Sequence, residues 1–131
     1  MTPNFVDIHC HLSPGVDDGA ADLAASMTMA RMAVADGTRT IIATPHQLGG
    51  YAGNRGDEIR RRTAELQREL TAAGIALAVL PGGDVRIEDD LPARLRTGEA
   101  LTLGEDMPVG RRPAPIPVRG WRRPFSRTKA A

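Results

Sequence analysis

Short apolar runs alternate along the chain with longer segments in which apolar residues recur at helical spacing. The runs predict strands, because they have the length and continuous apolar character of buried strands. The longer segments predict amphipathic helices. The expected strands are residues 4–8, 39–44, 75–80 and 99–103, and the expected helices are residues 22–36, 57–73 and 89–97. Within the helices, Asp57 is placed as an N-terminal cap, and Met27, Met29 and Met32 are expected to fill the core.

This order of elements predicts the fold class. Strands that alternate with helices favour a parallel sheet covered by helices, because right-handed crossovers return the chain to the same end of the sheet. We therefore expect an α/β fold, either an open sheet or part of a barrel. In both, functional groups gather at the carboxyl ends of the strands.

Imidazoles and carboxylates follow three of the expected strands. The first strand ends at His9 and His11, which are expected to face one way, because residues two apart on a strand point to the same side. Asp18 lies in the following loop, His46 comes directly after the second strand, and Asp84 comes after the third. All three histidines of the chain are therefore expected at one edge of the sheet.

This donor set predicts a divalent metal site. Imidazole and carboxylate ligands without a thiolate suit Mn, Fe or Zn, and bridging carboxylates can hold more than one ion. Asp7 lies on the histidine side and is placed to orient an imidazole. The simpler alternative is that the histidines form local hydrogen bonds and that Asp17 and Asp18 form a solvated turn. The arrival of further donors at neighbouring strand ends favours the metal interpretation.

Two other residues near these donors have competing interpretations. Cys10 invites comparison with cysteine phosphatases, which place a phosphate-binding arginine six positions after the nucleophile, but Val16 stands there. We therefore expect Cys10 to be a packed side chain on the opposite strand face. Arg86 lies two residues after Asp84 and is a candidate contact for a substrate anion, with a plain surface arginine as the equal alternative. The sequence identifies no other candidate catalytic side chain.

Composition divides the chain into two parts. Residues 1–106 hold all 16 acidic residues, whereas residues 107–131 hold seven basic residues, no acidic one and five of the ten prolines. We expect a domain at 1–106 and a disordered basic tail at 107–131. The tail's charge suits nonspecific binding to nucleic acid or anionic lipid, but it contains no recognisable binding module.

Location is predicted from what the sequence lacks. A lone cysteine excludes an internal disulfide, and no apolar run approaches the roughly 20 residues of a membrane span. No leader-like pattern opens the chain. We therefore expect a cytoplasmic protein without membrane insertion.

Three ordered blocks carry a resemblance to a known family. DIHCHLSPGVDDGA, RMAVADGTRTIIATPH and VLPGGDVRI resemble the bacterial protein-tyrosine phosphatases of the PHP (polymerase and histidinol phosphatase) superfamily, which are linked to capsule and exopolysaccharide synthesis. The resemblance spans about residues 5–105 and implies the N-terminal part of a distorted (β/α) barrel with a metal cluster, usually manganese. Carried over by position, it implies ligation by His9, His11, Asp18, His46 and Asp84.

The sequence departs from this family in two respects. Asp84 stands where the family usually has a metal-bridging glutamate, and its shorter side chain reaches about 1.5 Å less far. A displaced ion or weaker binding would follow. The family also supplies a further glutamate, a histidine and a late Asp-x-His pair, whereas no histidine follows His46 here. We therefore expect a C-terminally truncated or frame-shifted copy with impaired activity.

The resemblance also implies an activity and a partner. The reaction would be hydrolysis of phosphotyrosine by metal-activated water, on a tyrosine kinase of polysaccharide assembly. One alternative is a histidinol-phosphatase-like activity on small phosphate monoesters, and another is a non-catalytic metal-binding remnant with an anion-binding tail. Part of a barrel would leave an open strand edge and an uncovered apolar face, so a homo-oligomer is a further expectation.

Overall fold

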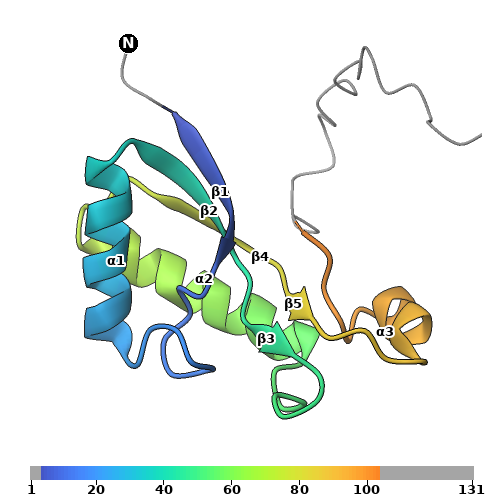
Figure 1. Cartoon of the computed structure of the whole chain (residues 1–131). Coiled ribbons are helices and arrows are strands. Elements are labelled where there is room, and N and C mark those ends of the chain that lie inside the picture. Colours follow the sequence, from blue (N-terminus) through green and yellow to red (C-terminus); the bar gives the residue numbers. More distant parts are fainter. Residues whose placement is uncertain (1–3, 104–131) are drawn as a thin grey trace, which may run out of the picture.

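The computed structural model describes residues 4–103. The elements follow one another as β1 (Phe5–Cys10), α1 (Leu23–Ala35), β2 (Thr38–Ala43), β3 (His46–Gln47), α2 (Gly56–Ala72), β4 (Ala78–Pro81), β5 (Asp84–Val85) and α3 (Leu91–Thr97), as Figure 1 shows. The predicted tail at 107–131 and the predicted boundary at residue 106 lie outside the described residues. Among the described residues, none of the helices has the length and apolar character needed to span a bilayer.

Parallel strand pairing confirms the predicted α/β class. One sheet has the order β1-β2-β4, and both of its strand pairs are parallel. A second, two-stranded parallel ladder pairs β3 with β5, and in it His46 lies opposite Asp84. Because β3 follows β2 and β5 follows β4, this ladder carries the chain past the carboxyl ends of β2 and β4 (Figure 1).

The core lies between the sheet and the first two helices. α1 packs on β2, α2 packs on β4, and the two helices contact each other, so they cover the same face. The buried core residues are Leu12, Ala30, Ile41, Ala43, Leu66, Leu70, Ile75, Leu77 and Val79. Burial of this apolar surface is the main force that holds the helices to the strands.

Helix ends follow local chemistry, with one exception. Asp22 caps α1 as its Oδ1 accepts from the amide of Ala25 at 2.8 Å. Gly37 follows α1 and Gly74 follows α2, with φ of 99° and 69°, values that favour glycine. The prediction that Asp57 caps α2 is wrong, because α2 begins at Gly56 without a side-chain cap.

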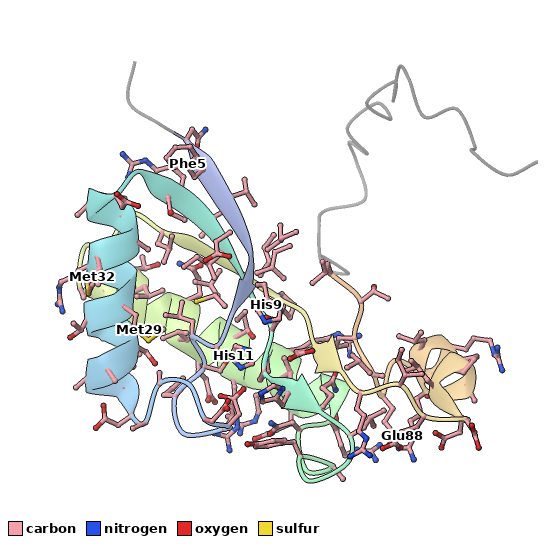
Figure 2. The ribbon with its side chains drawn as sticks, viewed as in Figure 1. Phe5, His9, His11, Met29, Met32 and Glu88 are labelled. Atoms are coloured by element: carbon pink, nitrogen blue, oxygen red, sulfur yellow. The ribbon has the colours of Figure 1, made fainter. Side chains whose placement is uncertain are left out.

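Two other predictions failed because apolar character does not by itself establish either strand structure or burial. Residues 99–103 form no strand, although Leu101 is buried, because the amide of Leu101 donates to the side chain of Gln47 at 2.8 Å instead of to a strand partner. Among the three methionines expected in the core, Met27 and Met29 pack against it, whereas Met32 is 67% exposed (Figure 2).

β1 forms one edge of the described sheet and is poorly covered. Phe5, Val6 and Ile8 are 56%, 58% and 57% exposed. Within residues 4–103, β2 is the strand that pairs with β1. Within the described part of the chain, the open edge and the exposed apolar residues that the sequence predicts are therefore both present.

Candidate metal centre

The two histidines at the end of β1 lie side by side, as predicted. Nε2 of His9 is 3.3 Å from Nε2 of His11, and the ring centroids are 5.3 Å apart. Between them, the backbone of Cys10 is fixed to the end of β2, since its amide donates to the hydroxyl of Thr44 at 3.1 Å and its carbonyl accepts from the amide of Thr44 at 2.9 Å. Both imidazoles therefore project from a firmly held segment at the end of β1 (Figure 2).

Asp17, rather than Asp7, orients an imidazole. Oδ2 of Asp17 lies 2.8 Å from Nδ1 of His11, and the Asp17 side chain is fully shielded from solvent. Asp7 instead accepts a bond from the backbone amide of His9 at 3.0 Å. The expected role of Asp7 toward an imidazole is therefore wrong among the described contacts, and a residue of the following loop takes it.

The charge state of Asp17 sets the tautomer of His11. Burial alone would raise the pKa of Asp17, but hydrogen bonds from the amide of Gly19, from His11 and from the amide of His46 outweigh burial and lower this pKa. An ionised carboxylate only accepts hydrogen bonds, so Nδ1 of His11 must carry the proton. Nε2 of His11 is then left with the lone pair that a cation needs.

His46 lies between two carboxylates. Its Nε2 is 3.2 Å from Oδ1 of Asp18, and its Nδ1 is 3.0 Å from Oδ2 of Asp84. The ring centroids of His46 and His11 are 4.5 Å apart. The strand ends that were expected to meet from the sequence therefore bring these side chains close together.

The five predicted donors form two overlapping groups of three. His9, His11 and Asp84 make one group, and His11, Asp18 and His46 make the other, with the donor atoms of each within 4.8 Å of one another. His11 belongs to both groups, so the five side chains form one continuous cluster. Three imidazoles and two carboxylates fit the ligand preferences of Mn, Fe or Zn.

A close backbone approach holds the loop that carries Asp17 and Asp18. A Cβ atom on Gly19 would lie 2.3 Å from the carbonyl oxygen of His11 and 2.4 Å from its Cβ, so the position requires glycine. The amide of Ala20 also donates to the carbonyl of His11 at 3.1 Å. The loop therefore folds directly back on the end of β1.

Gln47 and Asn54 fix the segment around His46. The buried amide of Gln47 donates to the carbonyls of Asn54 at 2.7 Å and Glu99 at 3.1 Å. The side chain of Asn54 donates to the carbonyls of His46 at 2.9 Å and Val16 at 3.0 Å. Sequence reasoning missed both residues, because their partners lie in distant loops and follow no strand or helix period.

Cys10 behaves as the packed side chain that the sequence predicts. It is partly buried and packs against the core. Burial, with a smaller contribution from the charge of Asp7, raises the pKa of the Cys10 thiol to about 11. The thiol is therefore protonated near neutral pH and is a poor nucleophile.

Among the described residues, two cavities lie near these elements, and one of them adjoins the donors. A cavity of about 260 Å³ is lined by His46, Gln47, Leu48, Gly50, Tyr51, Asp84 and Arg86. The expected position of Arg86 beside Asp84 is thus realised at a cavity wall. The ring of Tyr51 stacks on that of His46 at a centroid distance of 5.0 Å and an interplanar angle of 29°.

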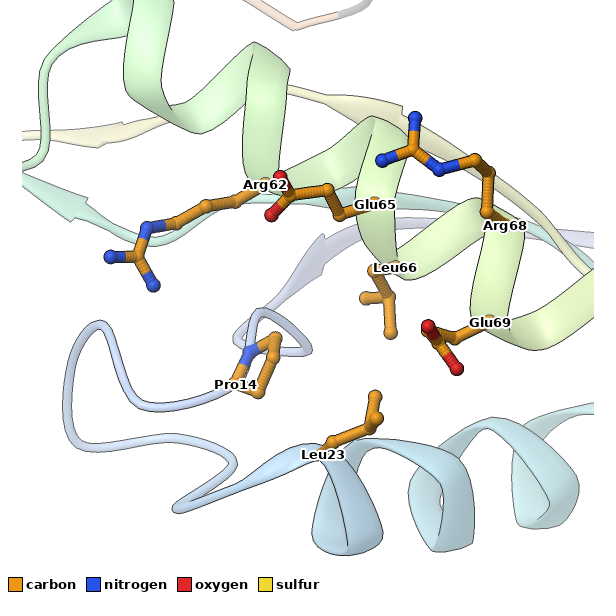
Figure 3. Close-up of a pocket in the computed structure, with 7 residues that line it drawn as sticks. All are labelled: Pro14, Leu23, Arg62, Glu65, Leu66, Arg68 and Glu69. Carbon is orange, nitrogen blue, oxygen red and sulfur yellow. The ribbon is translucent and has the colours of Figure 1, made fainter.

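The second cavity has a different character. It measures about 360 Å³ and lies between α2, the start of α1 and the loop after β1, as Figure 3 shows. Its lining residues are Pro14, Leu23, Arg62, Glu65, Leu66, Arg68 and Glu69. Its walls carry charges of both signs, and it contains none of the five donors.

Parallel strands whose carboxyl ends gather imidazoles and carboxylates are typical of α/β proteins that bind metal ions. The family described as "Capsular polysaccharide synthesis, CpsB/CapC" matches residues 5–109, and the chain belongs to this family. This finding confirms the resemblance that the three sequence blocks carry.

Relatives of known class give the same result. Tyrosine-protein phosphatase YwqE of Bacillus subtilis is 43% identical over 101 residues, which are 77% of this chain and 40% of YwqE. Tyrosine-protein phosphatase CpsB of Streptococcus agalactiae is 28% identical over 99 residues, which are 76% of this chain and 41% of that protein. The chain therefore spans about two fifths of the length of these relatives.

A solved structure confirms the fold. It is one of the crystal structures of YwqE from Bacillus subtilis and CpsB from Streptococcus pneumoniae. These two proteins are described as unique metal-dependent tyrosine phosphatases. It matches with a TM-score of 0.73 and 43% identity, over 76% of this chain and 40% of that chain. The mixed α/β arrangement of residues 4–103 is thus the arrangement found in that structure.

Proposed function

We propose that the five clustered donors bind divalent metal and that this site hydrolyses phosphotyrosine in a protein substrate. The observation that carries the proposal is the convergence of His9, His11, Asp18, His46 and Asp84 in two groups that share His11. The names of the relatives and the description of the solved structure support the choice of reaction.

Manganese is the proposed metal, with iron and zinc as the nearest competitors. Mixed imidazole and carboxylate ligands without a thiolate suit these ions. The cluster also brings three carboxylates together, since Asp17 lies behind His11 while Asp18 and Asp84 flank His46. A divalent cation would balance this negative charge.

The residues of this chain prepare the site for such an ion. When bound, a divalent metal supplies an acidified water and neutralises the charge of a phosphate group. Asp17 holds the proton at Nδ1 of His11 and so directs the Nε2 lone pair into the cluster. Oδ2 of Asp84 lies 3.0 Å from Nδ1 of His46 and fixes the orientation of that ring. The protonated thiol of Cys10 takes no part as a nucleophile.

The proposed partner follows from the family. Its description refers to capsular polysaccharide synthesis, and a tyrosine kinase of that assembly is the protein substrate that we propose. The free thiol of Cys10 fits a reducing compartment, so we place the reaction in the cytoplasm. Pairing of β1 with the β1 strand of a second copy belongs to the same proposal and is supported by its open edge.

Metal content and hydrolysis of the full chain test the proposal. We expect the protein dialysed against Mn²⁺ to retain metal by elemental analysis and to hydrolyse a phosphotyrosine peptide, and the His9→Ala, His11→Ala double variant to do neither. The Arg96→Ala variant, altered at an exposed arginine of α3, should match the wild type. Equal metal retention by the wild type and the double variant would overturn the metal site. Metal-loaded protein without peptide hydrolysis above the double variant would overturn the activity.

A further inference from the structure

We infer that the cavity beside the metal cluster receives an aryl phosphate, with Tyr51 contacting the aromatic ring and Arg86 contacting the phosphate. This inference rests on the proposed function, because the cluster would hold the same phosphate from its other side. It assigns the cavity a substrate-contacting role that would separate aromatic from aliphatic phosphate esters.

The cavity has the size and position that this role requires. Its volume of about 260 Å³ suits a small aromatic group, and two of the five metal donors, His46 and Asp84, form part of its wall. A group bound in it would therefore touch the cluster directly. Gly50 forms part of the wall, and a Cβ atom placed there would meet no atom within 4 Å. This part of the wall therefore leaves room for a ligand.

Arg86 offers a cation without a competing partner in the described structure. Its guanidinium forms no hydrogen bond or ion pair with residues 4–103, in contrast to Arg61, Arg62 and Arg94, which are paired with carboxylates. The side chain lies against Gly49, where an added Cβ would be 3.1 Å from Nη1 of Arg86. An exposed, unpaired guanidinium at the rim of a cavity is suited to a phosphate oxygen, because its planar donors match that geometry.

Tyr51 offers an aromatic surface that the backbone holds in place. Its ring stacks on His46, and it is 37% exposed, so part of the ring remains open to the cavity and solvent. A tight turn fixes its backbone, since the amide of Tyr51 donates to the carbonyl of Leu48 at 2.9 Å. The carbonyl of Tyr51 accepts from the amide of Asn54 at 2.9 Å. Contact between two aromatic rings favours an aryl ligand over an alkyl one.

Together the two side chains combine one cation and one aromatic ring at a single cavity. A small aliphatic phosphate would use Arg86 but leave Tyr51 without a partner. An uncharged aromatic group would contact Tyr51 but leave Arg86 without a partner. An aryl phosphate uses both, and this is the ligand chemistry that the cavity selects.

Binding of two phosphonates tests the inference without relying on turnover. Phenylphosphonate and methylphosphonate are not hydrolysed, and they differ in the aromatic ring. We expect the Mn²⁺-loaded full chain to bind phenylphosphonate more tightly in calorimetric titrations. Tyr51→Ala should weaken phenylphosphonate about two- to tenfold, which is the range for one aromatic pair, and leave methylphosphonate unchanged. Tyr51→Phe should retain the preference.

Arg86 variants test the other half of the inference. Arg86→Ala should weaken both phosphonates by about tenfold or more, since it removes a charge-assisted hydrogen bond, and Arg86→Lys should recover part of the loss. Arg96→Ala is the matched control and should change neither. Gly50→Leu keeps Tyr51 and Arg86 but adds a bulky side chain at the cavity wall, and it should selectively weaken phenylphosphonate. Circular dichroism establishes that each variant is folded.

The outcomes separate this inference from the proposed function. If the wild type binds both phosphonates in a manner that depends on His9 and His11, but Tyr51→Ala and Arg86→Ala bind as the wild type does, the assignment of the cavity is wrong and the metal site stands. Equal weakening of both ligands by Tyr51→Ala would also overturn the role of its ring. If the wild type binds neither phosphonate with Mn²⁺ present, both proposals fail.

Discussion

The carboxylate of Asp17 lies 2.8 Å from Nδ1 of His11 and is shielded from solvent. The same carboxylate accepts a bond from the backbone amide of His46 at 3.0 Å. One side chain therefore connects two of the three strand ends that carry the proposed metal ligands.

Replacing Asp17 by Asn should weaken metal binding without removing a ligand. The amide cannot hold the proton of His11 as a carboxylate does, and loss of such a supporting contact lowers metal affinity by about 10- to 100-fold. Titration of the folded variant with Mn²⁺ measures the effect. Asp22→Asn is the control, because it removes one charge from a nearby loop while Asn remains a good helix cap. Unchanged affinity in Asp17→Asn would contradict the role given to this residue.

Gly19→Ala should disturb the loop that carries Asp17 and Asp18. The new methyl group would meet the backbone of His11 at 2.3 Å, and relief of such a clash costs about 1–3 kcal/mol. We expect a lower free energy of unfolding, measured in denaturant, together with weaker Mn²⁺ binding. Gly53→Ala adds the same methyl group where no atom lies within 4 Å and should change metal binding little. Similar behaviour of the two variants would show that the approach of Gly19 to His11 is unimportant.

Asp84→Glu should strengthen metal binding. The resemblance to the PHP phosphatases places a glutamate here, and one extra methylene lets the carboxylate reach about 1.5 Å farther. We expect a lower dissociation constant for Mn²⁺, whereas Asp84→Asn, which keeps the length but removes the charge, should raise it. Weaker binding by the Glu variant would mean that the cluster is built for the shorter side chain.

Glu58 should make the stability of α2 depend on acid pH. Hydrogen bonds from Arg61 and Arg62 lower the pKa of Glu58 from 4.5 to about 2. Because the folded state has the lower pKa, these pairs stabilise it above pH 4.5, and their contribution is lost as the pH falls toward 2. Glu58→Gln should therefore lower the melting temperature slightly at pH 7. The difference from the wild type should shrink below pH 4.5.

Salt and a second variant complete that experiment. The pairs of Glu58 lie at the helix surface, so added salt should reduce their effect. Glu69 is an exposed residue of the same helix and forms no ion pair with residues 4–103. Glu69→Gln should therefore leave the melting temperature nearly unchanged. A constant difference between Glu58→Gln and the wild type from pH 7 to pH 2 is the result that would refute this account.

Ile8→Lys should reduce self-association. Ile8 is 57% exposed on the edge strand β1, and an edge lysine opposes pairing with another strand. Sedimentation velocity over a range of concentrations measures the change. Met32→Lys adds the same charge at a position of α1 that is 67% exposed, and it should leave association unchanged. A wild-type chain that stays monomeric at all concentrations would exclude pairing through β1.

Much of the fold and of the cluster followed from two simple regularities. Apolar runs alternating with amphipathic segments predicted the parallel strands and the helices, because burial imposes these periods. The positions of His46 and Asp84 directly after strands predicted their meeting, because parallel strands end at the same edge. Neither inference needed contacts between distant loops.

The remaining features depend on how loops fold back, which no local period reveals. Asp7 and Asp17 are equal candidates by residue type, and only the path of the loop through Gly19 decides between them. Gln47 bonds to residues up to 54 positions away. Residues 99–103 are apolar because part of the segment is buried beside Gln47, and burial alone does not distinguish a strand from an irregular segment.

The donors come from the end of β1 and the loop after it, from the start of β3 and from the start of β5, segments that an unfolded chain keeps far apart. An ion held among them would act as a reversible cross-link through the middle of the domain. Its contribution to stability would grow with the logarithm of the free metal concentration. Depletion of the metal would then lower the stability of the whole fold and also remove the proposed hydrolytic activity.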